Sequence, residues 1–179
     1  MTSSASVWAE KDLRIDFAGA VAVFSLDQHG KGHGLTHRFK GVDIVVEWQD
    51  AIWLVEVKDP ENSRIPPQHL TMQQKNFQET VASKSLIEQE LYPKLIDTLL
   101  FLALDRGIPA KPLRYFAILC LSSLDPVQLS HLQDKLLRHD GDWLKGPSEG
   151  WGKAFSAHIF NLESWNRNFP KYPLTRIGG

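Results

Sequence analysis

Hydrophobic and polar positions alternate most clearly in the stretch from Gly41 to Asp59. Two apolar runs, Val42–Trp48 and Ala51–Val57, are separated by the polar pair Gln49-Asp50. Both runs are rich in β-branched and aromatic residues, which is typical of the two strands of an antiparallel β-hairpin. The pattern therefore predicts a hairpin whose turn is centred on Gln49-Asp50.

The register of this hairpin decides which charged side chains share a face. An even-length loop pairs Asp43 with Glu56, and residues two apart on one strand point to the same side. Asp43, Glu56 and Lys58 are therefore predicted on one face, at the end away from the turn. An odd loop would place Asp43 and Glu56 on opposite faces. The other face is predicted to be apolar throughout: Val42, Ile44, Val46, Trp48, Trp53, Val55 and Val57.

The rest of the pattern predicts further strands and helices around the hairpin. We expect a short helix within Ser3–Arg14, a strand within Gly19–Leu26, a helix after His69 that is strongest over Lys84–Arg106, a strand over Leu113–Leu121, an amphipathic helix over Pro126–His139 and a strand over Ala154–Leu162. Pro93 is expected to kink the long helix, and Gly107 to end it. The segment Asp59–Pro67 is predicted to be irregular, and so is the C-terminal tail.

Composition restricts the class of protein. A chain of 179 residues with 42% hydrophobic residues fits a single domain over residues 1–179. No apolar run has the length of a membrane span or of a signal peptide, so we expect no membrane partner. The single cysteine, Cys120, excludes an intrachain disulfide and fits a cytoplasmic location. The net charge of -1 gives no overall attraction to nucleic acid.

Two carboxylates that face each other across a hairpin repel unless they are neutralised. One acid is protonated, Lys58 pairs with both, or a divalent cation lies between them. Mg²⁺ binds a few carboxylate oxygens and keeps several waters, and a neighbouring lysine is well placed to contact a metal-bound water or a phosphate. Burial and a metal charge can also lower the pKa of such a lysine.

The order Asp43, then Glu56-Val57-Lys58, resembles the active-site signature of the PD-(D/E)XK nuclease superfamily, which has the restriction-endonuclease-like fold. Val42 stands where the family has its proline. The resemblance implies an α/β fold with an αβββαβ core over about residues 5–122 and a central mixed sheet flanked by helices. Residues 123–179 are expected to form a C-terminal helix-strand-tail extension outside the part that carries the resemblance.

The resemblance also implies roles for individual residues. Asp43, Glu56 and the backbone carbonyl of Val57 would be ligands of Mg²⁺, or of Mn²⁺ in its place, and Lys58 would position or activate the attacking water. The first helix of the family often supplies another acid, for which Glu10 is the candidate. An exposed acid without a metal is the alternative interpretation of Glu10.

A nuclease also needs a local basic surface, because the net charge supplies none. The C-terminal segment places Arg167, Lys171 and Arg176 among aromatic residues, which suits contacts with nucleic acid. Lys31 lies in a glycine-rich loop and is a further candidate. A tail that packs on the core through its aromatic residues is an equal alternative.

Three functions agree with these observations. The first is a metal-dependent nuclease that acts on DNA or RNA, with DNA preferred, as a homodimer or with a partner protein. The second is a catalytically inactive member of the same fold that binds nucleic acid or assembles a complex. The third is an unrelated α/β interaction protein in which Asp43, Glu56 and Lys58 form a salt-bridge cluster.

Overall fold

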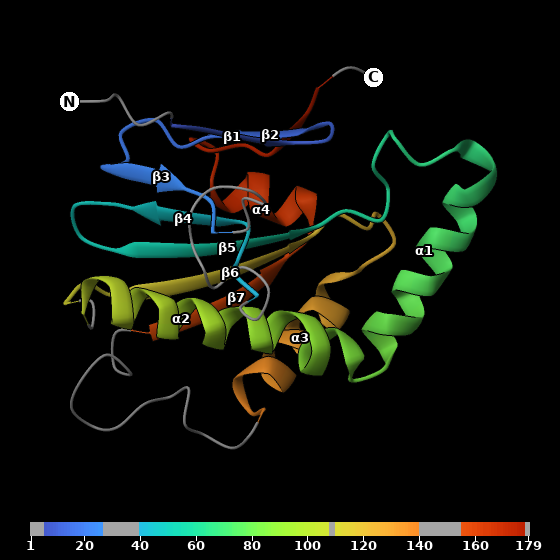
Figure 1. Cartoon of the computed structure of the whole chain (residues 1–179). Coiled ribbons are helices and arrows are strands. Elements are labelled where there is room, and N and C mark those ends of the chain that lie inside the picture. Colours follow the sequence, from blue (N-terminus) through green and yellow to red (C-terminus); the bar gives the residue numbers. More distant parts are fainter. Residues whose placement is uncertain (1–5, 27–39, 108–109, 140–154, 178–179) are drawn as a thin grey trace.

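The computed structural model describes residues 6–26, 40–107, 110–139 and 155–177. It is a mixed α/β structure with a central mixed sheet flanked by helices (Figure 1). The strands are β1 (Val7–Glu10), β2 (Leu13–Asp16), β3 (Ala22–Phe24), β4 (Ile44–Glu47), β5 (Ile52–Lys58), β6 (Leu113–Leu119), β7 (Phe155–Phe160) and β8 (Thr175–Arg176). The helices are α1 (Pro67–Ala82), the π-helix η1 (Leu86–Leu91), α2 (Tyr92–Arg106), α3 (Pro126–Leu137) and α4 (Leu162–Asn168).

The central sheet has the strand order β3-β4-β5-β6-β7. Strands β3, β4 and β5 are antiparallel neighbours, whereas β5, β6 and β7 run parallel. The parallel connection from β5 to β6 contains α1, η1 and α2, as expected for parallel strands that need a long crossover. The strand predicted over Ala154–Leu162 therefore forms an edge of this sheet.

Each face of the central sheet supports its own hydrophobic core, because neighbouring strand residues point to opposite sides. On β6, Tyr115 and Ala117 face the helices η1, α2 and α3. Phe116 and Ile118 face the other side, which is covered by α4 and by a small sheet of order β1-β2-β8. The molecule thus has three layers, with the central sheet in the middle.

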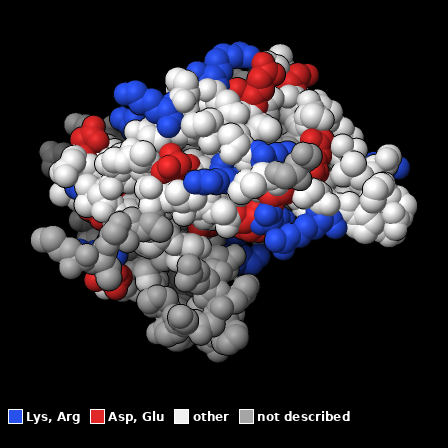
Figure 2. Space-filling model, turned by 90° about the horizontal axis from the view of Figure 1, so that it is seen from above, with Lys and Arg blue, Asp and Glu red and all other residues white. Residues whose placement is uncertain are grey.

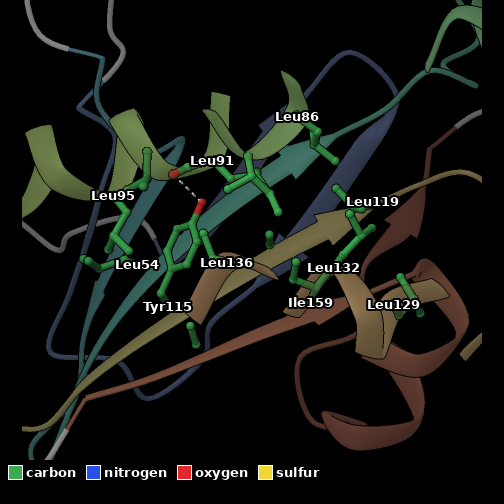
Figure 3. Packing of buried hydrophobic residues seen from close by; sticks show 14 of the residues in the cluster. Leu54, Leu86, Leu91, Leu95, Tyr115, Leu119, Leu129, Leu132, Leu136 and Ile159 are labelled. Atoms are coloured by element: carbon green, nitrogen blue, oxygen red, sulfur yellow. Dashed lines mark hydrogen bonds between the residues drawn. The ribbon is translucent and has the colours of Figure 1, made fainter. Parts of the chain in front are cut away.

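Leucines from the helices fill the first of these cores (Figure 3). Leu91 and Leu95 pack over Leu54 and Tyr115 of the sheet, and Leu132 approaches from α3. The buried hydroxyl of Tyr115 donates a hydrogen bond of 3.2 Å to the carbonyl of Leu91. This bond connects β6 to the last residue of the π-helix η1.

The helix predicted within Ser3–Arg14 is wrong over the described residues. β1 and β2 form an antiparallel hairpin there, with Glu10 opposite Leu13. Leu13 and Ile15 are buried while Arg14 and Asp16 are exposed, which is the two-residue period of a strand and not the period of a helix. Lys11 has a φ of 56° and turns the chain between the strands.

The prediction of an irregular tail is also wrong in part. Asn161 caps α4, because its side chain accepts a hydrogen bond from the backbone of Ser164. Trp165 of this helix is fully buried against the central sheet. The chain then returns to pair β8 with β2. The tail therefore packs on the core through its aromatic residues.

Several other predicted boundaries are confirmed. Gly107 ends α2 with a φ of 79°, a conformation that favours glycine. Asp125 caps α3, and Pro126 follows it at the first helical position. Pro93 was expected to kink or restart the long helix, and the π-helix η1 gives way to α2 at Tyr92, one residue before Pro93. Among the described residues, no helix combines the length and the apolar character needed to cross a membrane.

Candidate functional site

The hairpin has the predicted register. Ile44 faces Val55, and Glu47 faces Ile52. Continuing this pairing past the start of β4 brings Asp43 opposite Glu56, and the backbone N–H of Val57 donates a hydrogen bond of 2.7 Å to Oδ2 of Asp43. Asp43 is therefore held against the end of β5 by the strand itself. Val42 departs from the prediction, because its side chain belongs to the core on the helix side.

Glu56 is the most deeply placed acid of the site. Its side chain is fully buried on β5, on the helix side of the sheet. Burial in a low-dielectric environment, with the negative charge of Asp43 beside it, raises the pKa of Glu56 to about 7, although Lys94 and Lys58 oppose this shift. The carboxylate oxygen Oε2 has no hydrogen-bond partner among the described residues.

Lys94 lies between the two acids. Its Nζ atom is 2.9 Å from Oε1 of Glu56 and 3.2 Å from Oδ1 of Asp43. Burial opposes the charged form of Lys94, but the two carboxylates outweigh it and raise its pKa. Of the three ways to neutralise the acids, the structure therefore shows an ammonium between them, but this ammonium comes from helix α2 and not from β5.

Lys58 also contacts Glu56, and it reaches a third acid. Its Nζ atom is 3.1 Å from Oε1 of Glu56 and 2.7 Å from Oε2 of Glu90. Burial opposes the charge on Lys58, yet Glu56 and the hydrogen bond to Glu90 raise its pKa. The pKa of this lysine is therefore raised, in contrast to the lowered pKa that was considered from sequence.

The sequence interpretation missed both Glu90 and Lys94. They come from adjacent helices, because Glu90 lies near the end of η1 and Lys94 lies in the first turn of α2. One signal was present: Lys94 and Thr98 are polar positions on the same helix face as the buried Leu91, Leu95 and Leu102. Thr98 uses its hydroxyl to accept a hydrogen bond of 2.9 Å from the backbone N–H of Val42.

Asp43, Glu56, Lys58 and Lys94 line a polar cleft of about 460 Å³. Its floor is the end of β5, with Val57 and Lys58. The turn between β1 and β2 forms one wall, and helix α1 forms another wall beyond the carboxyl end of β5 (Figure 1). The cleft therefore lies where the first parallel strand ends, as expected for ligand sites in α/β sheets.

The cleft carries nearly balanced charge. Four acids and three lysines line it: Glu10, Asp43, Glu56, Asp59, Lys11, Lys58 and Lys94. Glu10 comes from β1 and not from a helix, and its exposed carboxylate is 3.5 Å from the ammonium of Lys11. A phosphate would meet no net positive charge here, so an anionic ligand needs an additional cation.

Arg176 does not contribute a free basic surface. Its guanidinium donates to both carboxylate oxygens of Asp59, at 2.8 and 2.9 Å, and to Asp12 at 2.9 Å. Asp59 also accepts a hydrogen bond from the backbone N–H of Glu61, at the start of the segment that was predicted to be irregular. Arg176 therefore fixes the chain just after Lys58 to the C-terminal strand.

The other basic candidates are not gathered at the cleft. Arg167 is exposed and pairs with Glu163 one helical turn earlier, Lys171 is exposed near α4, and Lys31 lies outside the described residues. Figure 2 shows one face of the molecule, on which Lys and Arg side chains are interspersed with Asp and Glu. No patch of one sign stands out among the coloured residues of that face.

The residues of the cleft fit a hydrated magnesium ion better than a metal held by protein alone. Within the described ranges, no group of three or more His, Cys, Asp or Glu side chains is arranged to hold a metal. Mg²⁺ requires only one or two carboxylates, since water completes its shell. Asp43 and Glu56 meet this requirement, and Oε2 of Glu56 is a buried acceptor without a donor.

Comparisons with known proteins add no relative to this description. No protein-family model matches the chain, and neither a curated protein nor a solved structure is significantly similar to it.

Proposed function

We propose that the cleft is the active site of a metal-dependent nuclease that hydrolyses phosphodiester bonds, with DNA as the preferred substrate. The observation that carries this proposal is the carboxylate of Glu56. It is fully buried beside Asp43 and Lys58, and one of its oxygens lacks a hydrogen-bond partner among the described residues. A buried acceptor of this kind is costly unless a cation or a donor occupies its free side.

We also propose that the chain has the PD-(D/E)XK fold. The antiparallel strands β3, β4 and β5, the helices that follow them, and the parallel strand β6 support this assignment. The hairpin in place of an N-terminal helix is a departure from the expected αβββαβ order. It removes the basis for Glu10 as a helix-borne ligand, although Glu10 still lines the cleft.

Each side chain then has a definite task. Asp43 and Glu56, with the carbonyl of Val57, would hold Mg²⁺, or Mn²⁺ in its place. The ion would supply positive charge for the phosphate and lower the pKa of a bound water. Lys58 would orient the attacking water, and its hydrogen bond to Glu90 keeps the ammonium at the cleft. Lys94 holds the two carboxylates together in the absence of the ion.

A cleavage assay tests this proposal. Purified protein is incubated with linear, branched and single-stranded DNA and with RNA, in the presence of Mg²⁺, Mn²⁺ or a chelator. We expect metal-dependent cleavage that is lost in Asp43→Asn, Glu56→Gln and Lys58→Met. Glu47→Gln, on the same face but near the turn, is the matched control and should retain activity. Cleavage that persists in Glu56→Gln and Lys58→Met would refute the assigned roles.

One observation favours a second function. Because Lys94 already lies between Asp43 and Glu56, the acids are neutralised without a metal. A catalytically inactive member of the same fold, which binds nucleic acid or a partner protein, would keep this arrangement permanently. Calorimetric titration with Mg²⁺ separates the two functions: the nuclease predicts binding that disappears in Asp43→Asn, and the inactive protein predicts no binding.

A further inference from the structure

The wall of the cleft formed by α1 differs chemically from the rest of the site. Gln73, Asn76, Phe77 and Thr80 line the cleft from this helix. Their spacing of three, four and seven residues places them on one helix face. None of the four carries a charge, whereas the floor and the opposite wall are formed largely by acids and lysines.

The four amide side chains from Gln73 to Gln78 of α1 divide into two groups. Gln74 and Gln78 point away from the cleft and are engaged, since Gln74 donates to Glu61 at 2.9 Å and Gln78 donates to Ser123 at 2.7 Å. Gln73 and Asn76 face the cleft, and neither side chain has a hydrogen-bond partner among the described residues. Of these four amides, the two without a hydrogen-bond partner are therefore the two that line the cleft.

Phe77 lines the cleft together with these amides. Its ring is partly buried and packs against the core on the helix side, so its position is fixed by the protein. It also lines the cleft, which leaves part of the ring available to a ligand. The hydroxyl of Thr80 donates to the carbonyl of Asn76, so Thr80 adds little polarity to this wall.

A nucleic acid carries its charge on phosphates and its uncharged, planar groups on bases. A wall of one aromatic ring and two free amides suits a base, because base–aromatic stacking is common in single-strand recognition and amides form paired hydrogen bonds with base edges. The volume of about 460 Å³ is in the range of small-ligand sites. It favours an unpaired nucleotide over a duplex.

We propose that α1 is the base-binding wall of the active site, so that the substrate is a single-stranded or locally unpaired nucleic acid. Phe77 stacks on the base next to the scissile phosphate, and Gln73 and Asn76 hydrogen-bond to its edge. This assignment rests on the proposed nuclease function, because it takes the charged floor of the cleft as the place of the phosphate.

Binding of fluorescent oligonucleotides tests the wall separately from catalysis. Anisotropy is measured with Ca²⁺ in place of Mg²⁺, using one labelled strand alone and the same strand in a blunt duplex. The wild-type protein should bind the single strand at least tenfold more tightly. Phe77→Leu should weaken single-strand binding roughly five- to hundredfold, as expected for the loss of one stacking contact. Phe77→Trp should restore it.

Matched variants on the same helix control for folding and for general effects. Met72→Leu and Gln68→Ala change exposed residues that do not line the cleft, and they should bind as the wild type does. The double variant Gln73→Ala/Asn76→Ala, at two exposed positions, should weaken single-strand binding even if Phe77→Leu proves unstable in a thermal melt.

The outcomes distinguish this inference from the nuclease proposal. Equal affinity for the single strand and the duplex, or unchanged binding by both Phe77→Leu and the double variant, would overturn the inference even if metal-dependent cleavage is observed. Single-strand binding that depends on Phe77 and the two amides, without any cleavage, would support the base-binding role of α1 and would overturn the proposed nuclease activity.

Discussion

The buried carboxylate of Glu56 predicts an unusual dependence of stability on pH. The folded protein raises the pKa of this group from 4.5 to about 7, because burial and Asp43 disfavour the ionised form. Between these two values the folded protein binds more protons than the unfolded chain. The free energy of unfolding of the metal-free protein should therefore decrease as the pH rises from about 5 to about 7, and should level off above.

The size of this effect follows from the two pKa values. The contribution of Glu56 between pH 5 and pH 8 is about 2–3 kcal/mol. For a protein of this size, such a change corresponds to roughly 5–10 °C in Tm. Because the group is fully buried, screening by solvent does not reduce the effect as it would for a surface acid.

Urea unfolding of wild type and Glu56→Gln at pH 5, 6, 7 and 8, with a chelator present, measures this contribution. Other groups titrate in the same range, so the readout is the difference between the two pH profiles. We expect Glu56→Gln to lack the 2–3 kcal/mol decrease. Glu47→Gln, whose carboxylate pairs with Lys111 at 3.0 Å near the turn, is the control and should follow the wild type. Parallel profiles for wild type and Glu56→Gln would refute the reasoning.

Three further predictions concern contacts around the cleft. Lys94→Met removes the ammonium that bridges the two carboxylates and should cost about 3 kcal/mol of unfolding free energy at pH 8. A thermal melt should show partial recovery with Mg²⁺, while the exposed Lys75→Met should show no loss. Equal melts for both variants would contradict the bridging role. Arg176→Lys removes the two parallel hydrogen bonds to the carboxylate of Asp59 and should cost about 1–2 kcal/mol of unfolding free energy, measured by urea unfolding. Arg167→Lys, at an exposed ion pair, should be nearly neutral. Similar losses in both variants would argue against a special role for Arg176. Tyr115→Phe should lower the free energy of unfolding by about 1 kcal/mol, because it removes the hydroxyl that donates to the carbonyl of Leu91. An unchanged unfolding midpoint would show that this hydrogen bond does not stabilise η1.

The local pattern of the sequence was sufficient to predict the hairpin. Its two-residue period and polar turn set the register, and the register brought Asp43 opposite Glu56. Cap and stop residues were similarly local, so Asp125 and Gly107 predicted the start of α3 and the end of α2.

Two errors arose where local signals competed. A short helix was expected within Ser3–Arg14, whereas the alternation of Leu13, Ile15 and Phe17 is the period of a strand and was the stronger signal. In the tail, Asn161 is a capping residue whose helix is short, and burial of Trp165 stabilises it. Tertiary packing decides such short elements, so sequence periodicity alone predicts them poorly.

The two site residues that come from helices, Glu90 and Lys94, could not be predicted because their positions depend on long-range packing. Glu90 and Lys94 come from helices more than thirty residues after Glu56 in the chain, and their direction depends on the π-helix η1. A π-helical turn shifts the following residues around the helix axis, so a regular helical projection misplaces them. The sequence therefore predicted Asp43, Glu56 and Lys58 but neither Glu90 nor Lys94.

The most direct test of the proposed site is the position of a metal ion and of Lys94 in crystals soaked with Mn²⁺. We expect anomalous density between Asp43 and Glu56, within contact of Oε2 of Glu56, with the ammonium of Lys94 displaced from its place between the two carboxylates. Crystals in which Lys94 keeps its contacts of 2.9 and 3.2 Å and no metal density appears would contradict the metal-dependent site.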